Sequence, residues 1–322
     1  MLNRRYLRTK VMQALYAFFQ SNDDRMDIAE RNLIKSIDKL YELYIYQLSI
    51  LVELVDFSRR RLEENKLKHI PSAKDLNPNY RFIDNRFIKQ LENNINFQLH
   101  SNRLKINWSE EQDMFRSIYQ KIIESKTFDD YMNAEVSTYA IDKKLIISIL
   151  RKFIIIDESL QNYFEDKNIY WADDYLTVSM MVIKTIDSFT ESDGESFSLP
   201  ELYKNEDRNN VDDDKNFVID LFRKTIINAD KFEKLISVKT TNWEVERIAI
   251  VDNILIKMAL VELLEFPSIP IKVTLNEYIE ISKAYSSDKS KIFINGVLDK
   301  LIDDLKADKS IRKIGRGLIE NN

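Results

Sequence analysis

Hydrophobic residues recur at helical spacing along most of the chain. In the clearest case the apolar side chains stand three or four residues apart and would line one face of a single long helix: Leu33, Ile37, Leu40, Tyr44, Leu48, Leu51 and Val55. Glycine and proline, which turn-rich β architectures need at their corners, number only four and five in 322 residues. The sequence therefore predicts an all-α fold with long helices.

The same spacing marks further helices on both sides of this one. The first lies near the amino terminus, where an apolar stripe is formed by Leu7, Val11, Ala14, Leu15 and Phe18. Others are predicted over residues 87–97, 110–125, 145–154, 176–189, 211–238, 248–264, 275–285 and 293–305. Pro71 and Pro78 mark a break, and a polar loop over residues 192–195 leads to Pro200.

Two residue types that carry much enzyme chemistry are scarce. Cysteine is absent, which excludes disulfides, cysteine-ligated zinc and thiol nucleophiles and suits a reducing cytosol. His69 and His100 are the two histidines, so a zinc enzyme or a Ser-His-Asp hydrolase is hard to build. The apolar run from Leu43 to Val52 is too short for a bilayer, which needs about twenty residues. We expect a cytoplasmic protein that is not an enzyme and holds no cofactor or metal.

Positive charge gathers at the amino terminus of an otherwise acidic chain. The net charge is −5, yet Arg4, Arg5, Arg8 and Lys10 precede the first acid, Asp23. On a helix, the three arginines and Tyr16 would share about a third of the circumference. Arginine forks suit phosphate, and an exposed tyrosine can stack on an unpaired base. The alternative is an ordinary solvated face, and burial of these arginines in internal ion pairs would contradict an RNA-binding surface.

Two local signals near the carboxyl end concern helix starts and packing. Thr274 and Glu277 form a T-x-x-E pattern that predicts a capping box, with a helix from Leu275 to about Tyr285. Gly296 lies inside a helical pattern, where glycine costs about 1 kcal/mol relative to alanine, and its usual explanation is tight packing of two helices. Asn295 beside it is a candidate polar contact.

Residues near both ends resemble the NusB family. Arg4-Arg5-x-x-Arg8 followed by Gln13-Ala14-Leu15-Tyr16 is similar to the family opening RR-x-x-R…QALY. The distal similarity runs through DNIL at 252–255, VEL at 261–263, IPIKV at 269–273, NEYIEISK at 276–283 and FINGVLDK at 293–300. The resemblance covers about the first 20 residues and roughly residues 212–305.

The resemblance implies a pair of small helical bundles that bind the boxA element of ribosomal RNA leader transcripts. It implies action with NusE, a small-subunit ribosomal protein, in a transcription antitermination complex with RNA polymerase. The RNA-binding residues that follow from it and from the basic face are Arg4, Arg5, Arg8, Gln13, Tyr16, Tyr285, Ser290, Phe293 and Asn295. Asp252 matches an acidic position on the NusE-facing side.

The chain also departs from the family. Tyr6 stands where another arginine is common, and residues 286–292 differ from the usual pattern. About 190 residues have no counterpart in a typical member. We therefore expect a first helix over residues 1–20, a helical insertion of unknown role over 21–205, a carboxyl-terminal bundle over 206–308 and a flexible basic tail over 309–322.

Two other function classes compete with RNA binding. One is a protein-interaction scaffold in ribosome biogenesis or transcription, in which the insertion is the working part and RNA binding has been lost. The other is an enzyme, because NusB-like domains also resemble the front end of some ribosomal RNA cytosine methyltransferases. Those enzymes need a catalytic cysteine and a glycine-rich cofactor loop, and this chain has neither.

Overall fold

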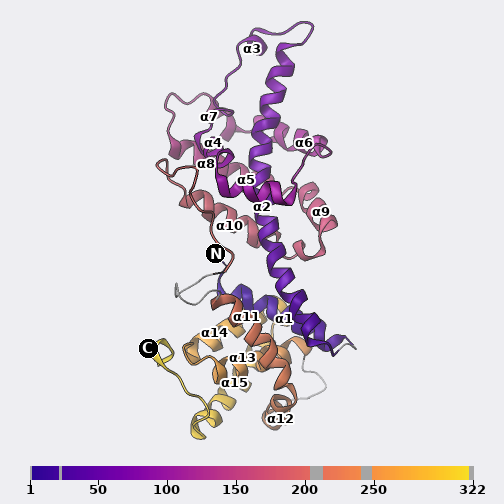
Figure 1. Cartoon of the computed structure of the whole chain (residues 1–322), viewed down its shortest axis with the longest axis vertical. Coiled ribbons are helices and arrows are strands. Elements are labelled where there is room, and N and C mark those ends of the chain that lie inside the picture. The colour runs from indigo at the N-terminus through magenta and orange to yellow at the C-terminus, as the bar shows by residue number, and fades with distance from the viewer. Residues whose placement is uncertain (1, 22–23, 204–212, 241–248, 319–322) are drawn as a thin grey trace. The chain divides into compact units, whose positions relative to one another are not determined.

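The protein, as a computed structural model, is described over residues 2–21, 24–203, 213–240 and 249–318, and every regular element in these ranges is a helix (Figure 1). The predicted all-α fold is confirmed. The chain divides into two units, which we call unit 1 (Met1–Ile37 and Leu202–Asn322) and unit 2 (Asp38–Glu201). None of the helices in the described ranges is long and apolar enough to cross a membrane.

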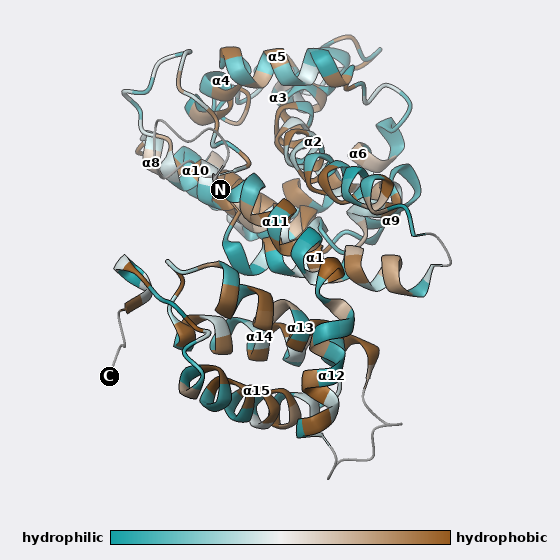
Figure 2. Ribbon diagram, turned by 60° about the horizontal axis from the view of Figure 1, so that its bottom comes forward, coloured by the Kyte–Doolittle hydropathy of each residue, from teal (hydrophilic) through white to brown (hydrophobic). Residues whose placement is uncertain are grey.

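Unit 1 is a bundle around one central helix. Its helices are α1 (Arg4–Gln20), α11 (Asp213–Ile227), α12 (Ala229–Lys239), α13 (Ile250–Glu265), α14 (Ile271–Tyr285) and α15 (Ser290–Ala307). Helix α13 contacts all the others, and its residues Ile254–Ile256 and Met258–Leu263 are buried. Helices α14 and α15 alternate between hydrophobic and hydrophilic residues (Figure 2), as helices at the rim of a bundle do.

Unit 2 is assembled on the long helix α2 (Met26–Lys66), which begins in unit 1. Its other helices are α3 (Ala73–Leu76), α4 (Arg86–Glu92), α5 (Ile95–Leu104), α6 (Gln112–Ile123), α7 (Lys126–Met132), α8 (Tyr139–Ile149), α9 (Glu158–Lys167) and α10 (Tyr175–Ser188). A π-helical turn, Leu150–Ile154, continues α8, and a 3₁₀ turn, Ile169–Trp171, follows α9.

An aromatic cluster forms the core of unit 2 beside α2. The ring of Phe164 lies within 6.3 Å of the rings of Tyr46, Trp108, Trp171 and Tyr175, mostly edge to face. Two of these rings have hydrogen-bond partners that are neutral groups of the same unit: the Trp108 indole donates to Ser49 and the Tyr175 hydroxyl to the carbonyl of Ile154.

Several element boundaries differ from the sequence expectations, and two of the differences concern unit 1. Residues 26–37 of α2 belong to unit 1, where Leu33 is buried and Arg223 of α11 forms an ion pair with Glu30, so unit 2 begins at Asp38 rather than at residue 21. The predicted helix over 211–238 is two helices, α11 and α12, which meet at Asn228. Periodicity shows which faces are apolar, but it does not reveal a change of direction between two helices with compatible faces.

The structure describes residues 309–318 of the segment predicted as a flexible basic tail. Residues 310–318 run back over the turn that joins α13 to α14, where the amide of Ile314 donates to the carbonyl of Pro267 at 3.0 Å. Lys313 donates through Nζ to the carbonyl oxygens of Glu262 and Phe266, at 3.3 and 3.0 Å. These carbonyls lie at the carboxyl-terminal end of α13, where the helix dipole makes a nearby cation favourable. Residues 319–322 lie outside the described ranges.

Candidate nucleic-acid interface

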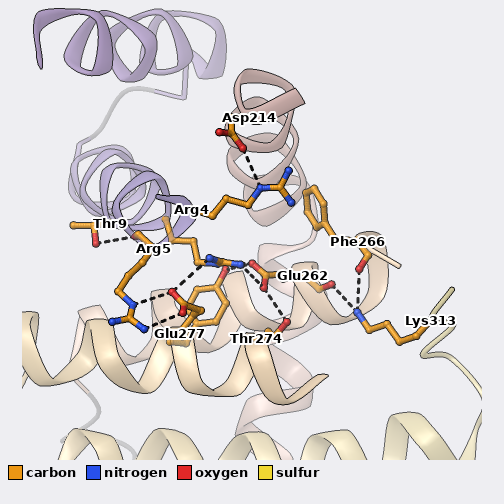
Figure 3. A network of polar contacts seen from close by, with 11 residues as sticks. Arg4, Arg5, Thr9, Asp214, Glu262, Phe266, Thr274, Glu277 and Lys313 are labelled. Atoms are coloured by element: carbon orange, nitrogen blue, oxygen red, sulfur yellow. Dashed lines mark hydrogen bonds and ion pairs between the residues drawn. The ribbon is translucent and has the colours of Figure 1, made fainter. Parts of the chain in front are cut away.

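A buried carboxylate lies at the centre of unit 1. Glu262 of α13 is fully buried and accepts four hydrogen bonds. Two come from Arg8 of α1, at 2.7 and 2.8 Å, and two from the hydroxyls of Thr274 and Tyr278 of α14, at 2.8 and 3.2 Å. Because a carboxylate without partners is very costly to bury, this network fixes how α1, α13 and α14 pack (Figure 3).

The predicted capping box at Thr274 is wrong. Helix α14 begins at Ile271, one turn earlier, with Pro270 at its N-cap position and no capping side chain. Thr274 is therefore inside the helix and uses its hydroxyl for Glu262, while Glu277 pairs with Arg5 (Figure 3). The T-x-x-E spacing has a different cause: the two residues stand about one turn apart on the face of α14 that meets α1.

Arg8 does not lie on an exposed basic face as expected. Its side chain is 3% exposed, and it forms a two-pronged ion pair with Glu262. Burial opposes the charge, but Glu262 outweighs it and raises the pKa of the Arg8 guanidinium. Burial in an internal ion pair is the condition that would contradict an RNA contact, and Arg8 meets it. The side chain of Arg8 packs inside unit 1.

Arg4 and Arg5 lie nearer the surface. Arg4 forms an ion pair through Nε with Asp214 of α11 at 3.0 Å, and 30% of its side chain is exposed. Arg5 binds both carboxylate oxygens of Glu277 at 2.9 Å, which raises its pKa, and 46% of its side chain is exposed. Figure 3 shows Arg4 directed toward α11 and Arg5 toward α14. These two arginines keep part of their side chains open to solvent.

A cavity of about 550 Å³ opens beside these arginines. Its walls come from the amino-terminal end of α1, from the start of α14 and from the tail, and they include the side chains of Arg4, Arg5, Arg8, Glu277 and Arg316. Arginines are the most numerous charged residues in this lining, which suits an anionic ligand.

The predicted aromatic contacts are exposed. Tyr16 of α1 has 43% of its surface exposed and Tyr285, the last residue of α14, has 40%. Gln13 on α1 is half-buried. Tyr285 stands twelve residues beyond Val273, so the helix places it about 18 Å from the cavity at the start of α14. The two ends of α14 thus offer different chemistry, arginines at one and a tyrosine at the other.

The residues predicted at the start of α15 are mostly inside unit 1. Ser290, Phe293 and Asp252 are buried. The carboxylate of Asp252 accepts a hydrogen bond from the hydroxyl of Ser286 at 2.6 Å. The hydroxyl of Ser286 also lies 2.8 Å from that of Ser290. These residues fix the turn between α14 and α15.

Asn295 and Gly296 of α15 are half-buried. The amide of Asn295 donates to Asp299 at 2.9 Å. A methyl group added at Gly296 would meet no atom within 4 Å, so the expected tight helix packing at this glycine is wrong. Within the part of the chain that the structure describes, no cluster of His, Cys, Asp or Glu is placed to hold a metal ion.

Sequence reasoning missed the network and the tail. Glu262 had a visible signal, since it is a charged residue in the otherwise apolar run from Ile254 to Leu263. A lone charge at such a position needs a buried partner of opposite sign. Lys313 and Arg316 had no such signal, because their placement depends on contacts with α13 and with the start of α14.

Comparison with known proteins gives similarities to one family. Residues 178–303 match the model of the NusB family. A transcription antitermination protein NusB of Salinibacter ruber is 37% identical over 142 residues, which cover 43% of this chain and 86% of that protein. Proteins of the same description from Chloroherpeton thalassium and Gloeobacter violaceus are 39% identical over 106 residues and 32% over 120, with 50% and 56% of their lengths covered. No solved structure shows significant similarity to the chain.

Proposed function

The chain belongs to the NusB family, and from this premise we propose that it is a transcription antitermination factor that binds RNA at the amino-terminal end of α1. The proposed RNA is a boxA-like element of a ribosomal RNA leader. The proposed partners are NusE and, through the antitermination complex, RNA polymerase. Family membership favours binding rather than catalysis, and the site below has the chemistry for it.

The observation that carries the proposal is the partial exposure of Arg4 and Arg5 beside an arginine-lined cavity. The ion pair of Arg5 with Glu277 is near the surface, and such pairs contribute only about 0–1 kcal/mol, so exchanging this carboxylate for a phosphate costs little. Arg4 pairs through Nε with the buried Asp214, and 30% of its side chain is exposed. The guanidinium fork then binds phosphate oxygens in pairs.

The exposed tyrosines supply the second kind of contact. Tyr16 and Tyr285 present ring surface on which unpaired bases stack, and such stacking is worth about 1–3 kcal/mol per base. Gln13 and Asn295 add amide groups that suit base edges in single-stranded RNA. Arg8, Ser290 and Phe293 are buried, so their proposed role is to position α1 and α15.

Asp252 takes a similar indirect role toward the proposed partner protein. Its carboxylate holds Ser286 and hence the turn between α14 and α15. We propose that this turn forms part of the NusE-facing surface, with Asp252 fixing its conformation.

The proposal is tested by binding of a boxA-like RNA to the full chain, with and without NusE, over a range of salt concentrations. Arg4→Ala and Arg5→Ala should each lower the slope of log affinity against log salt by about one unit, since each removes one phosphate contact. Arg31→Ala is the matched control, because this α2 arginine of unit 1 is 73% exposed and does not line the cavity.

Two outcomes would count against the proposal. If the Arg4→Ala, Arg5→Ala double variant binds RNA like the Arg31→Ala control, the site is elsewhere. If the unaltered chain binds NusE but no RNA in either condition, the protein is an interaction scaffold instead.

A further inference from the structure

The carboxyl-terminal segment is shaped to lie against the α13–α14 turn. Gly317 passes so close to this turn that an added Cβ atom would lie 2.0 Å from the carbonyl oxygen of Pro267. Gly315 has φ of +51°, in the left-handed region that favours glycine. The segment therefore needs glycine at both positions, one for its conformation and the other for its close approach.

Lys313 anchors the same segment on the end of α13. Its ammonium group donates to two carbonyls there, and burial lowers its pKa to about 8. The half-buried ammonium group of Lys313 thus holds the tail on the backbone at the end of α13. The contacts of Lys313, Ile314 and Gly317 converge on one short stretch of unit 1, Glu262 to Pro267.

Arg316 lies between the two glycines and lines the cavity with Arg4, Arg5 and Arg8. The carboxylates of Asp214, Glu277 and Glu262 pair with the three α1 arginines. The tail therefore brings a fourth arginine to the wall of this cavity.

Two helices also begin at this cavity. The amino-terminal ends of α1 and α14 both contribute to its walls, and neither first turn contains an acidic residue. Helix α14 has no capping side chain, and the two arginines that start α1 are unfavourable toward the helix dipole, a cost that their carboxylate partners Asp214 and Glu277 offset. The amino-terminal ends of both helices thus favour a negatively charged ligand, as the arginines do.

From these contacts we propose that the folded-back tail is a working part of the RNA site: it brings Arg316 into the cavity, which binds a phosphodiester group of the RNA backbone. This proposal rests on the proposed RNA-binding function and adds the cavity as a phosphate subsite. Gly317 and Lys313 act as positioning residues, because they hold the tail and do not touch the ligand. The cavity volume of about 550 Å³ accommodates a phosphate with its ribose.

The test uses full-length protein and a single-stranded boxA-like RNA, with affinity measured against salt. Arg316→Ala should lower the salt slope by about one unit and weaken binding several-fold. Gly317→Ala should do the same while leaving every charge in place, because the new Cβ atom forces the tail away from Pro267. Arg312→Ala is the matched control, since this exposed tail arginine does not line the cavity.

The outcomes separate the two proposals. If Arg316→Ala matches the Arg312→Ala control while Arg4→Ala still weakens binding, the tail is not part of the site and the proposed function stands. A Gly317→Ala protein with the slope of the unaltered chain would also overturn the tail's role. If the unaltered chain binds no RNA, both proposals fail together. Should Gly317→Ala lower the melting temperature sharply, the comparison of Arg316→Ala with Arg312→Ala decides alone.

Discussion

Units 1 and 2 are both helical, but the polar groups at the Glu262 network and in the aromatic cluster have partners of different kinds. The core of unit 1 contains an ion pair, in which the carboxylate of Glu262 meets the guanidinium of Arg8. The aromatic core of unit 2 satisfies its polar atoms with neutral partners, as in the bonds from Trp108 to Ser49 and from Tyr175 to Ile154. A buried ion pair ties the two helices that carry it much more strictly than a neutral hydrogen bond does.

This difference agrees with how readily a family resemblance is recognised in the sequence of each unit. An ion pair between α1 and α13 requires particular residues at particular positions, and Arg8 and Glu262 both fall within stretches that resemble the NusB pattern. Aromatic residues such as Phe164 and Trp171 meet the needs of many cores, so they predict helices and burial but no family. The matched residues 178–303 accordingly lie largely in unit 1.

The largest effect is expected when one partner of the buried ion pair in unit 1 is removed. Arg8→Ala leaves the Glu262 carboxylate buried without its cation, so the free energy of unfolding should fall by about 3–5 kcal/mol. Urea denaturation measures the loss, and peptide-resolved hydrogen exchange should localise it to unit 1. Arg5→Ala is the matched control, because its exposed pair with Glu277 is worth less than about 1 kcal/mol. Equal losses in the two variants would contradict the importance of burial.

A smaller effect is expected from the corresponding change in unit 2. Tyr175→Phe removes a neutral donor to the carbonyl of Ile154 and keeps the ring in the aromatic cluster, so unfolding should become easier by only about 1–2 kcal/mol. Protection from exchange should fall in unit 2 and stay unchanged around Glu262. A loss as large as that of Arg8→Ala would show that neutral bonds constrain unit 2 as strongly as the ion pair constrains unit 1.

The smallest change in stability is expected in unit 1, at Gly296, which lies outside the Glu262 network. Gly296→Ala should stabilise the protein by about 0.5–1 kcal/mol, because alanine is the better helix former and the added methyl meets no atom within 4 Å. Thermal unfolding of the variant should shift upward by a few degrees. A decrease in melting temperature would mean that Gly296 is packed more tightly than its open surroundings indicate.

The sequence by itself determined the helical fold and the apolar faces of the helices. Leu7, Val11 and Leu15 of α1 recur at helical spacing, and all three are fully buried. The long helix expected from Leu33 to Val55 is α2. These outcomes follow from local chemistry, because helical spacing and the scarcity of glycine and proline act over a few neighbouring residues.

Which charged residues are buried depends on contacts between helices that are far apart in the sequence. The sequence of α1 alone does not distinguish Arg8 from Arg4 and Arg5. Arg8 is buried because Glu262, 254 positions further along the chain, lies against it. The same holds for Thr274, which resembles a cap in sequence and is a hydrogen-bond donor to that carboxylate, and for Arg316, which the tail carries into the cavity. The physical reason is that the cost of burying a charge depends on its partners in space, and sequence spacing reports only those within one helix.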